Sequence, residues 1–262
     1  MHGALHVAKT GVSAQDTNLK VISNNLANVS TVGFKKDRAV FEDLLYQIRR
    51  QPGAQNADDA QLPSGVQLGN GVKLVSTQKM FEVGDMEVTD RQLDLAIGGP
   101  GFFQVQLPNG DIGYTRNGQF HTGADGQVVT AEGYPLVPEI VIPPNVVEVA
   151  IGTNGQVQGV INGEEAQLLN LGDIQLANFI NPQGLQSRGS NVFIETAASG
   201  PALLSVPGED GTGFINQGFV ENSNVNAVEE LVNMITTQRA YEINSKVIST
   251  ADQMLSFLNQ QL

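Results

Sequence analysis

The fold is decided by residues 5–29, which read LHVAKTGVSAQDTNLKVISNNLANV. Two columns of residues recur every seven positions in this region. One contains Leu5, Val12, Leu19 and Leu26, and the other contains Met1, Ala8, Gln15, Ile22 and Val29. This spacing over four heptads predicts a helix over residues 1–32, with a narrow apolar seam for a partner helix. Gly33 is expected to end it, because glycine takes the left-handed conformation at little cost. The alternative is an ordinary amphipathic helix packed on its own domain.

A second long helix is predicted over residues 226–262. Asn226 is the expected N-cap, and Glu229 lies three residues further on, as in a capping box. The sevenfold columns contain Met234, Tyr241, Ile248, Leu255 and Leu262, with Thr237, Asn244, Ala251 and Leu258 beside them and a further stripe of Ala240, Val247 and Met254. Two apolar stripes imply contacts on more than one side, so we expect this helix to be buried in an assembly.

Between the helices the pattern changes to short β-prone runs separated by turn dipeptides. The runs cover residues 102–107, 112–116, 127–131, 135–142, 156–161 and 173–180. The dipeptides are Asn109-Gly110, Asn117-Gly118, Asp125-Gly126, Asn154-Gly155 and Asn162-Gly163. Such spacing predicts an all-β domain over about residues 71–222.

Residues 51–70 fit neither pattern, because they are rich in Gln, Asn, Gly and Pro. They predict either a flexible linker or an extended arm that orders only against a neighbour. The expected fold class is therefore α+β. Long terminal helices pair as a coiled-coil-like inner domain (1–33 and 224–262), a connecting segment and extended arm follow (34–70), and a central all-β domain covers 71–223.

Composition narrows the function. The 262 residues carry 14 Lys and Arg against 27 Asp and Glu, a net charge of −13, which disfavours a nucleic-acid binder. Residues 1–50 hold seven basic and four acidic residues (+3), and the remainder holds seven and 23 (−16). Cysteine is absent, which excludes disulfides, thiol catalysis and cysteine–zinc sites. No motif points to a catalytic residue, a metal or a cofactor, and the N-terminus does not have the pattern of a secretory signal.

Three groups of residues resemble bacterial flagellar rod and hook proteins. They are residues 22–28 (ISNNLAN) with Thr31, Gly33, Phe34 and Lys35; residues 223–226 (SNVN) with the helix that follows up to Glu242; and the central residues 101–105 and 114–118. Residues 44–65 resemble an insertion associated with straight, stiff rods.

The resemblance implies a homo-oligomeric helical tube, lined by the paired terminal helices, that acts as a drive shaft across the periplasm. It also implies export by the flagellar type III apparatus without a cleaved signal peptide. The implied partners are proximal rod proteins, hook or hook-junction subunits, and the surrounding P- and L-ring proteins.

The heptad pattern and the resemblance together indicate which residues are expected to mediate assembly. On the N-terminal helix they are Leu5, Val12, Leu19, Ile22, Asn24, Asn25, Leu26, Asn28 and Val29. On the C-terminal helix they are Met234, Tyr241, Val247, Ile248, Met254, Leu255, Leu258 and Leu262. In the arm they are Tyr46, Gln51, Pro52, Gly53, Leu62 and Pro63. The three asparagines are poor helix-interior residues, so we expect their amides to bond to neighbours or to form an exposed polar face. The other functions left open are another rod or hook subunit, and a secreted β-domain enzyme or glycan-binding module with helical tails.

Overall fold

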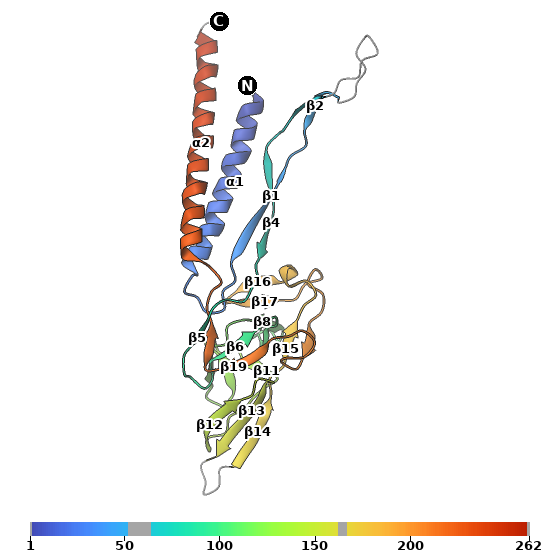
Figure 1. The fold of residues 1–262 in the computed structure, drawn as a ribbon, viewed down its shortest axis with the longest axis vertical. Coiled ribbons are helices and arrows are strands. Elements are labelled where there is room, and N and C mark those ends of the chain that lie inside the picture. Colours follow the sequence, from blue (N-terminus) through green and yellow to red (C-terminus); the bar gives the residue numbers. More distant parts are fainter. Residues whose placement is uncertain (1, 52–63, 162–166, 261–262) are drawn as a thin grey trace. The chain divides into compact units, whose positions relative to one another are not determined.

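A computed structural model describes residues 2–51, 64–161 and 167–260 of the chain (Figure 1). The expected order of helix, β-rich middle and helix is confirmed. The chain divides into two compact units. The helical unit contains Met1–Leu26, Asp37–Gln78 and Asn226–Leu262, and the β unit contains Ala27–Lys36 and Lys79–Val225. The predicted residues that lie outside the described ranges are Met1, Pro52, Gly53, Leu62, Pro63, Asn162, Gly163 and Leu262.

The N-terminal helix, α1, covers His2–Ala27 and ends before the predicted position. Turns follow it, in which Thr31 donates its backbone N–H to the carbonyl of Asn28 and its hydroxyl to the Asn28 side chain. Asparagines weaken helix interiors, so the cluster at 24–28 stops the helix before Gly33 is reached. Gly33 does have a φ of +70°, but it belongs to the following segment, where its N–H donates to the carbonyl of Glu221 at 2.7 Å.

The C-terminal helix, α2, covers Ala227–Gln260. Asn226 is its N-cap as predicted, because its side-chain oxygen accepts the N–H groups of Val228 at 3.0 Å and Glu229 at 3.3 Å. Glu229 and Glu230 lie in the first turn, where a negative charge complements the helix dipole. No helix in the described part of the chain is both long enough and apolar enough to cross a bilayer.

Four strands complete the helical unit. Three of them lie before residue 71, where the sequence predicted a connecting segment and an extended arm, and the fourth lies at the start of the predicted β domain. β1 (Asp37–Asp43) pairs with β4 (Val72–Lys79), and β2 (Gln47–Arg50) pairs antiparallel with β3 (Val66–Leu68). β1 reads DRAVFED and lacks clean polar–apolar alternation, so its strand character depends on its partner β4 rather than on local pattern.

The β unit contains one five-stranded sheet, one three-stranded sheet and several two-stranded pairs. The five-stranded sheet has the order β11 (Leu136–Val137), β7 (Phe103–Gln106), β8 (Ile112–Thr115), β17 (Val192–Ile194), β16 (Gln186–Gly189). The three-stranded sheet consists of β12 (Val146–Ile151), β13 (Gln156–Ile161) and β14 (Gln167–Asp173). The pairs are β5 (Met86–Val88) with β20 (Phe219–Glu221), β6 (Leu95–Gly98) with β19 (Phe214–Gln217), β9 (Phe120–Thr122) with β10 (Val128–Thr130), and β15 (Leu176–Asn178) with β18 (Leu203–Ser205). A 3₁₀ turn covers Pro182–Gly184.

Three of the predicted turn dipeptides connect paired strands. They are 109–110 between β7 and β8, 125–126 between β9 and β10, and 154–155 between β12 and β13, each with its glycine at positive φ. Asn117-Gly118 is not a hairpin turn, because β8 pairs with β7 and β17 rather than with β9. Gly118 is needed for a different reason: a Cβ there would lie 1.7 Å from the carbonyl oxygen of Leu95.

Two apolar clusters make up most of the core of the β unit, and a third, smaller one contains Val105, Leu107 and Val192. The larger one is mainly aliphatic and gathers side chains from β6, β7, β9 to β13, β15 and β19. The second is aromatic: Phe102 packs edge-to-face against Phe81, Phe179 and Phe193, and Tyr114 does so against Phe179. These contacts give the unit a fixed core of its own.

Candidate assembly surfaces

The two helices of the helical unit lie side by side and antiparallel (Figure 1). Asn18 of α1 donates its side-chain amide to the hydroxyl of Thr237 of α2 at 3.1 Å. Nearer the start of α2, the amide nitrogen of Asn25 lies 3.5 Å from a carboxylate oxygen of Glu230. The contacts between the helices therefore include polar side chains as well as apolar ones.

The predicted leucine column of α1 is only half-buried in the chain. The buried side chains of the helix are Ala8, Ala14, Ile22 and Asn25. Leu5, Val12, Leu19 and Leu26 each keep an intermediate exposure, as does Val29 in the turns that follow. Area that a single chain leaves in water remains available for contact with another molecule.

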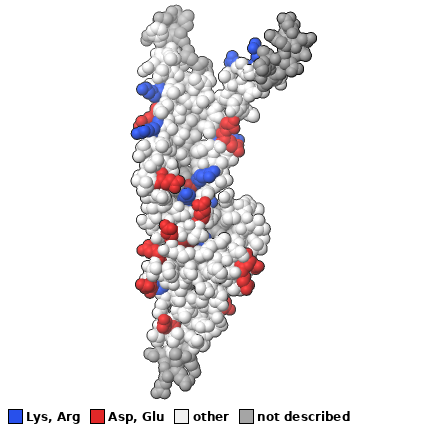
Figure 2. Space-filling model, in the orientation of Figure 1, with Lys and Arg blue, Asp and Glu red and all other residues white. Residues whose placement is uncertain are grey.

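The predicted residues of α2 divide into two groups. Met234, Ile248 and Leu255 are half-buried, whereas Tyr241, Val247 and Met254 are exposed. The side chain of Leu258 lies outside the described residues. The helix also exposes six other large apolar side chains, namely Val228, Leu231, Val232, Ile235, Ile243 and Phe257. On the face drawn in Figure 2, charged atoms form small separate groups with uncharged atoms between them.

An apolar groove of about 440 Å³ lies between the first turn of α1 and the second half of α2. Ala4 contributes from α1, and Ile243, Val247, Ala251 and Met254 contribute from α2, with Lys246 and Thr250 completing the lining. Large exposed apolar surfaces of this kind mark interaction sites in soluble proteins.

Asn25 makes the side-chain hydrogen bonds that the sequence predicts. Its amide nitrogen donates to the carbonyl of Asp37 at 2.9 Å, and its amide oxygen accepts the N–H of the same residue at 2.9 Å. The side chain thus bonds to the backbone at the start of β1 as a neighbouring strand would, and it is 2 % exposed. Of the other two asparagines, Asn24 is exposed and Asn28 is half-buried.

The described part of the predicted arm exposes almost all of its side chains. Every residue of β2 and β3 is exposed, and so are Tyr46 and Gln51. Leu45 is 89 % exposed. A hydrogen bond to the carboxylate of Asp43 raises the pKa of the Tyr46 hydroxyl. A two-stranded ribbon with both faces in water is marginally stable by itself.

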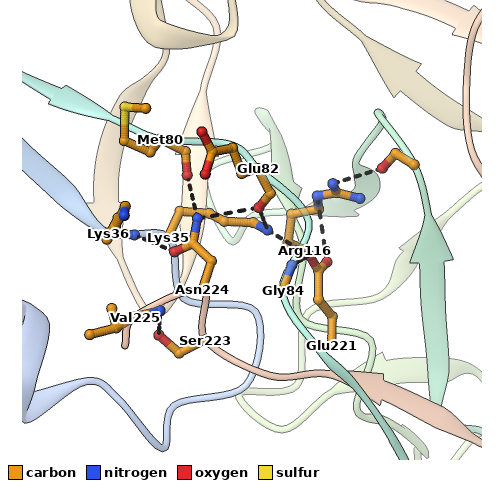
Figure 3. Close-up of polar contacts among 11 residues, drawn as sticks. Lys35, Lys36, Met80, Glu82, Gly84, Arg116, Glu221, Ser223, Asn224 and Val225 are labelled. Atoms are coloured by element: carbon orange, nitrogen blue, oxygen red, sulfur yellow. Dashed lines mark hydrogen bonds and ion pairs between the residues drawn. The ribbon is translucent and has the colours of Figure 1, made fainter. Parts of the chain in front are cut away.

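A buried charge cluster in the β unit joins Lys35, in the segment after α1, and Arg116, after β8, to Glu221 of β20 (Figure 3). The ammonium of Lys35 donates to the Glu221 carboxylate and to the carbonyl of Glu82, both at 2.5 Å. The guanidinium of Arg116 lies 3.7 Å from the other carboxylate oxygen, and Gly84 donates its N–H to the first at 2.9 Å. The side chains of both ion pairs are at most 1 % exposed. One carboxylate is therefore shared by two cations away from water.

Asn224, three residues after Glu221 and between β20 and α2, continues this network (Figure 3). Its amide oxygen accepts the N–H of Lys36 at 2.8 Å, and its amide nitrogen donates to the carbonyl of Met80 at 2.8 Å. The segment after α1 and the segment before α2 are thereby bonded to each other and to the strand region between them.

Burial sets the protonation behaviour of this unit. Desolvation lowers the pKa of Lys35 and of Arg116, while the Glu221 carboxylate opposes the shift in both cases. Desolvation and then the neighbouring Glu195 carboxylate raise the pKa of Tyr114 to about 12. Among the residues that the structure describes, no three His, Cys, Asp or Glu side chains gather as metal ligands would.

From the sequence, Lys35 and Arg116 were identified only as parts of motifs. Their shared partner, Glu221, was not predicted. The available signal was that a basic residue follows the apolar Phe34 and an acidic residue follows Val220. That local pattern indicates a charged residue next to a buried apolar one, but it does not indicate that Lys35 and Glu221 form an ion pair with each other.

Three regions of the chain match protein families. Residues 5–35 match the family described as flagella basal body rod protein, residues 96–159 the D1 domain of the flagellar hook protein FlgE/F/G, and residues 216–261 the C-terminal region of the flagellar basal body rod FlgEFG protein. The flagellar basal-body rod protein FlgG of Buchnera aphidicola subsp. Schizaphis graminum is 56 % identical over 98 % of both chains. The chain belongs to the flagellar basal-body rod protein family.

Other members of the rod family agree along the whole chain. FlgG of Caulobacter vibrioides is 50 % identical over 98 % of both chains, and FlgG of Bacillus subtilis is 36 % identical over 97 % of both. The three family matches cover most of α1, the buried lysine, a central part of the β unit and all of α2.

Proposed function

We propose that this protein is a structural subunit of the distal rod of the bacterial flagellum. It assembles with copies of itself into a rigid helical tube, which transmits torque from the motor across the periplasm to the hook. The observation that carries this proposal is the large apolar area that both helices leave uncovered in the described chain, together with membership of the rod family.

The terminal helices act as the inner assembly domain, paired in a coiled-coil-like manner over residues 1–33 and 224–262. One face of α2 packs against α1, whereas Val247, Met254 and their neighbours are exposed to other copies. A contact between different faces of identical subunits generates a ring if the rotation closes and a helical filament if it does not. The central β domain, residues 71–223, lies outside the tube.

Residues 46–65 act as an extended arm that orders against a neighbouring subunit. The exposed side chains of β2 and β3 support this role, since a hairpin with no covering layer gains stability from a partner. The contacts beyond copies of itself are with proximal rod proteins, hook or hook-junction subunits and the P- and L-ring proteins. Export uses the flagellar type III apparatus without a cleaved signal peptide, and the protein has no catalytic role.

Electron microscopy of the purified protein after concentration tests the proposal directly. Straight tubes are expected from the natural chain. Leu26→Asp and Leu255→Asp should each prevent tube formation while the thermal transition of the β unit is retained, because a carboxylate placed in an apolar contact is costly to desolvate. Ser245→Asp, on the exposed surface of α2, is the matched control. Normal tubes from both leucine variants would contradict the role of these helices.

One comparison supports an alternative in which the protein occupies a different place in the flagellar rod or hook. The flagellar hook-basal body complex protein FlhP of Bacillus subtilis is 32 % identical over 96 % of both chains, so another rod or hook position is the alternative. Deleting residues 46–65 distinguishes the two. Curved or softened tubes would support a distal-rod subunit, and unchanged straight tubes would favour the alternative.

A further inference from the structure

The contacts between α1 and α2 follow a single repeating register. Asn25 faces Glu230 and Asn18 faces Thr237 through side-chain contacts. One heptad nearer the N-terminus, a Cβ on Gly11 would lie 3.0 Å from the amide nitrogen of Asn244. One heptad further, Ala4 and Ala251 line the same groove. Each step of seven residues back along α1 is matched by a step of seven forward along α2.

This register column consists of small and polar side chains, although both helices are rich in large apolar ones. On α1 it contains Ala4, Gly11, Asn18 and Asn25, and on α2 it contains Ala251, Asn244, Thr237 and Glu230. Leu5, Val12, Leu19 and Leu26 are each the next residue after a column member, so the leucines that the sequence placed in the seam flank it instead.

A shift of one heptad in either direction breaks the column. One shift would place the carboxylate of Glu230, which is 6 % exposed, opposite Val32, beyond the end of α1 and without its amide partner. The other would set Glu230 against Asn18 and leave Asn25 opposite Ser223, before the start of α2. Asn244 would lose the space that Gly11 leaves and would face Asn18 or Ala4 instead. Large apolar side chains, in contrast, pack against one another in several registers, which is why single polar residues specify register in helix pairs.

We propose that the register column sets the alignment of the two helices, and that the flanking leucines do not. The inference rests on the proposed function for its purpose, because the register decides which apolar side chains of the pair are presented to another copy. In this alignment Ala4 reaches the groove formed by Ile243, Val247 and Met254. A shifted pair would present a different surface.

Crosslinking measures the register directly, and the chain offers no background because it contains no cysteine. In the full-length monomer, Ala4→Cys with Ala251→Cys reports the observed register, and Ala4→Cys with Leu258→Cys reports a shift of one heptad. Oxidation should give at least roughly tenfold more intramolecular disulfide for the first pair than for the second, since losing one buried polar pairing shifts an equilibrium by about that factor. Equal yields would overturn the proposal.

Variants separate the polar pair from packing in general. Asn18→Leu with Thr237→Leu should bring the two crosslinking yields within about threefold of each other, since apolar pairs tolerate several registers. The exchanged pair, Asn18→Thr with Thr237→Asn, keeps one hydrogen bond and should restore the natural ratio. Gln238→Leu adds the same apolar side chain on the exposed surface and should leave the ratio unchanged. An unchanged ratio in the double leucine variant would overturn the proposal.

Tube formation is scored separately by electron microscopy. A natural chain that keeps the observed register but forms no tubes would refute the proposed function and leave the register column standing. Tubes formed from a chain that crosslinks equally in both registers would refute the register column and leave the proposed function standing. If the double leucine variant does not fold, the comparison of the two cysteine pairs in the natural background still decides the question.

Discussion

Replacing Glu221 by Gln removes the carboxylate that lies between the buried ammonium of Lys35 and the buried guanidinium of Arg116. Two cations are then left in a site with almost no access to water. Replacing Lys35 by Met removes one cation but leaves the carboxylate with Arg116 and with the N–H of Gly84. The two substitutions break the same ion pair, yet they leave charge imbalances of different size.

The magnitudes follow from what remains. Breaking a buried ion pair by removing one partner costs about 3–5 kcal/mol, and Glu221→Gln should lie at the upper end because two cations lose their counter-ion. Lys35→Met should cost about 2–3 kcal/mol, since the carboxylate keeps one cation and one backbone donor. The double variant should be more stable than Glu221→Gln alone, because the second substitution removes one of the two uncompensated charges.

Equilibrium urea unfolding followed by circular dichroism measures these differences. Lys73→Met is the control: its ammonium lies 3.4 Å from Glu42, but both side chains are more than half exposed, so the cost should stay below about 1 kcal/mol. The reasoning is refuted if Glu221→Gln costs less than Lys35→Met. It is also refuted if the double variant is destabilised by the sum of the two single effects.

Three further outcomes are expected. Folding raises the pKa of Tyr114 from 10.0 to about 12, so the stability that this group contributes is complete below pH 10 and is lost as the pH rises through 12. The loss in the free energy of unfolding should reach at most about 2.7 kcal/mol. Urea titrations at several pH values measure it, and Tyr114→Phe should remove this pH dependence. Gly118→Ala should lower the free energy of unfolding by about 2–4 kcal/mol because its Cβ meets a backbone carbonyl, whereas Gly123→Ala, with ordinary contacts from 3.5 Å, should stay within about 0.5 kcal/mol in the same assay. Asn25→Ala should cost about 2–4 kcal/mol by removing two buried hydrogen bonds to the backbone of Asp37, and Asn25→Asp should cost at least as much, because its carboxylate faces a carbonyl and Glu230; thermal unfolding ranks the two.

Local chemistry explains which parts of the fold the sequence predicted. The N-cap at Asn226 and the hairpins at 109–110, 125–126 and 154–155 depend on a few adjacent residues, so they could be inferred from those residues. The end of α1 was predicted too late because glycine is a stronger helix-termination signal than asparagine, although the asparagines at 24–28 come first in the chain. β1 was missed, and β4 lay inside the predicted β domain without being predicted as a strand of its own, because neither is a strand without the other.

The candidate assembly surfaces show the same limit. Heptad periodicity identified the helices and their apolar columns, but periodicity alone does not say which column faces the neighbouring helix. The choice between the leucines and the residues one position before them depends on groups far away in the chain: Thr237 for Asn18, and Glu230 and Asp37 for Asn25. The meeting of Lys35 with Glu221 is equally invisible to any short window of sequence.

The ion pair between Lys35 and Glu221 has a consequence for how the chain acquires its structure over time. The two residues are 186 positions apart, and bringing the ends of such a loop together costs roughly 4–5 kcal/mol of chain entropy. When the polypeptide emerges with its N-terminus first, Lys35 is present long before its counter-ion, Glu221, which lies near the C-terminal end of the chain. In an incomplete chain Lys35 could be buried only at a desolvation cost that no carboxylate offsets, so the β unit closes only after nearly the whole polypeptide is present.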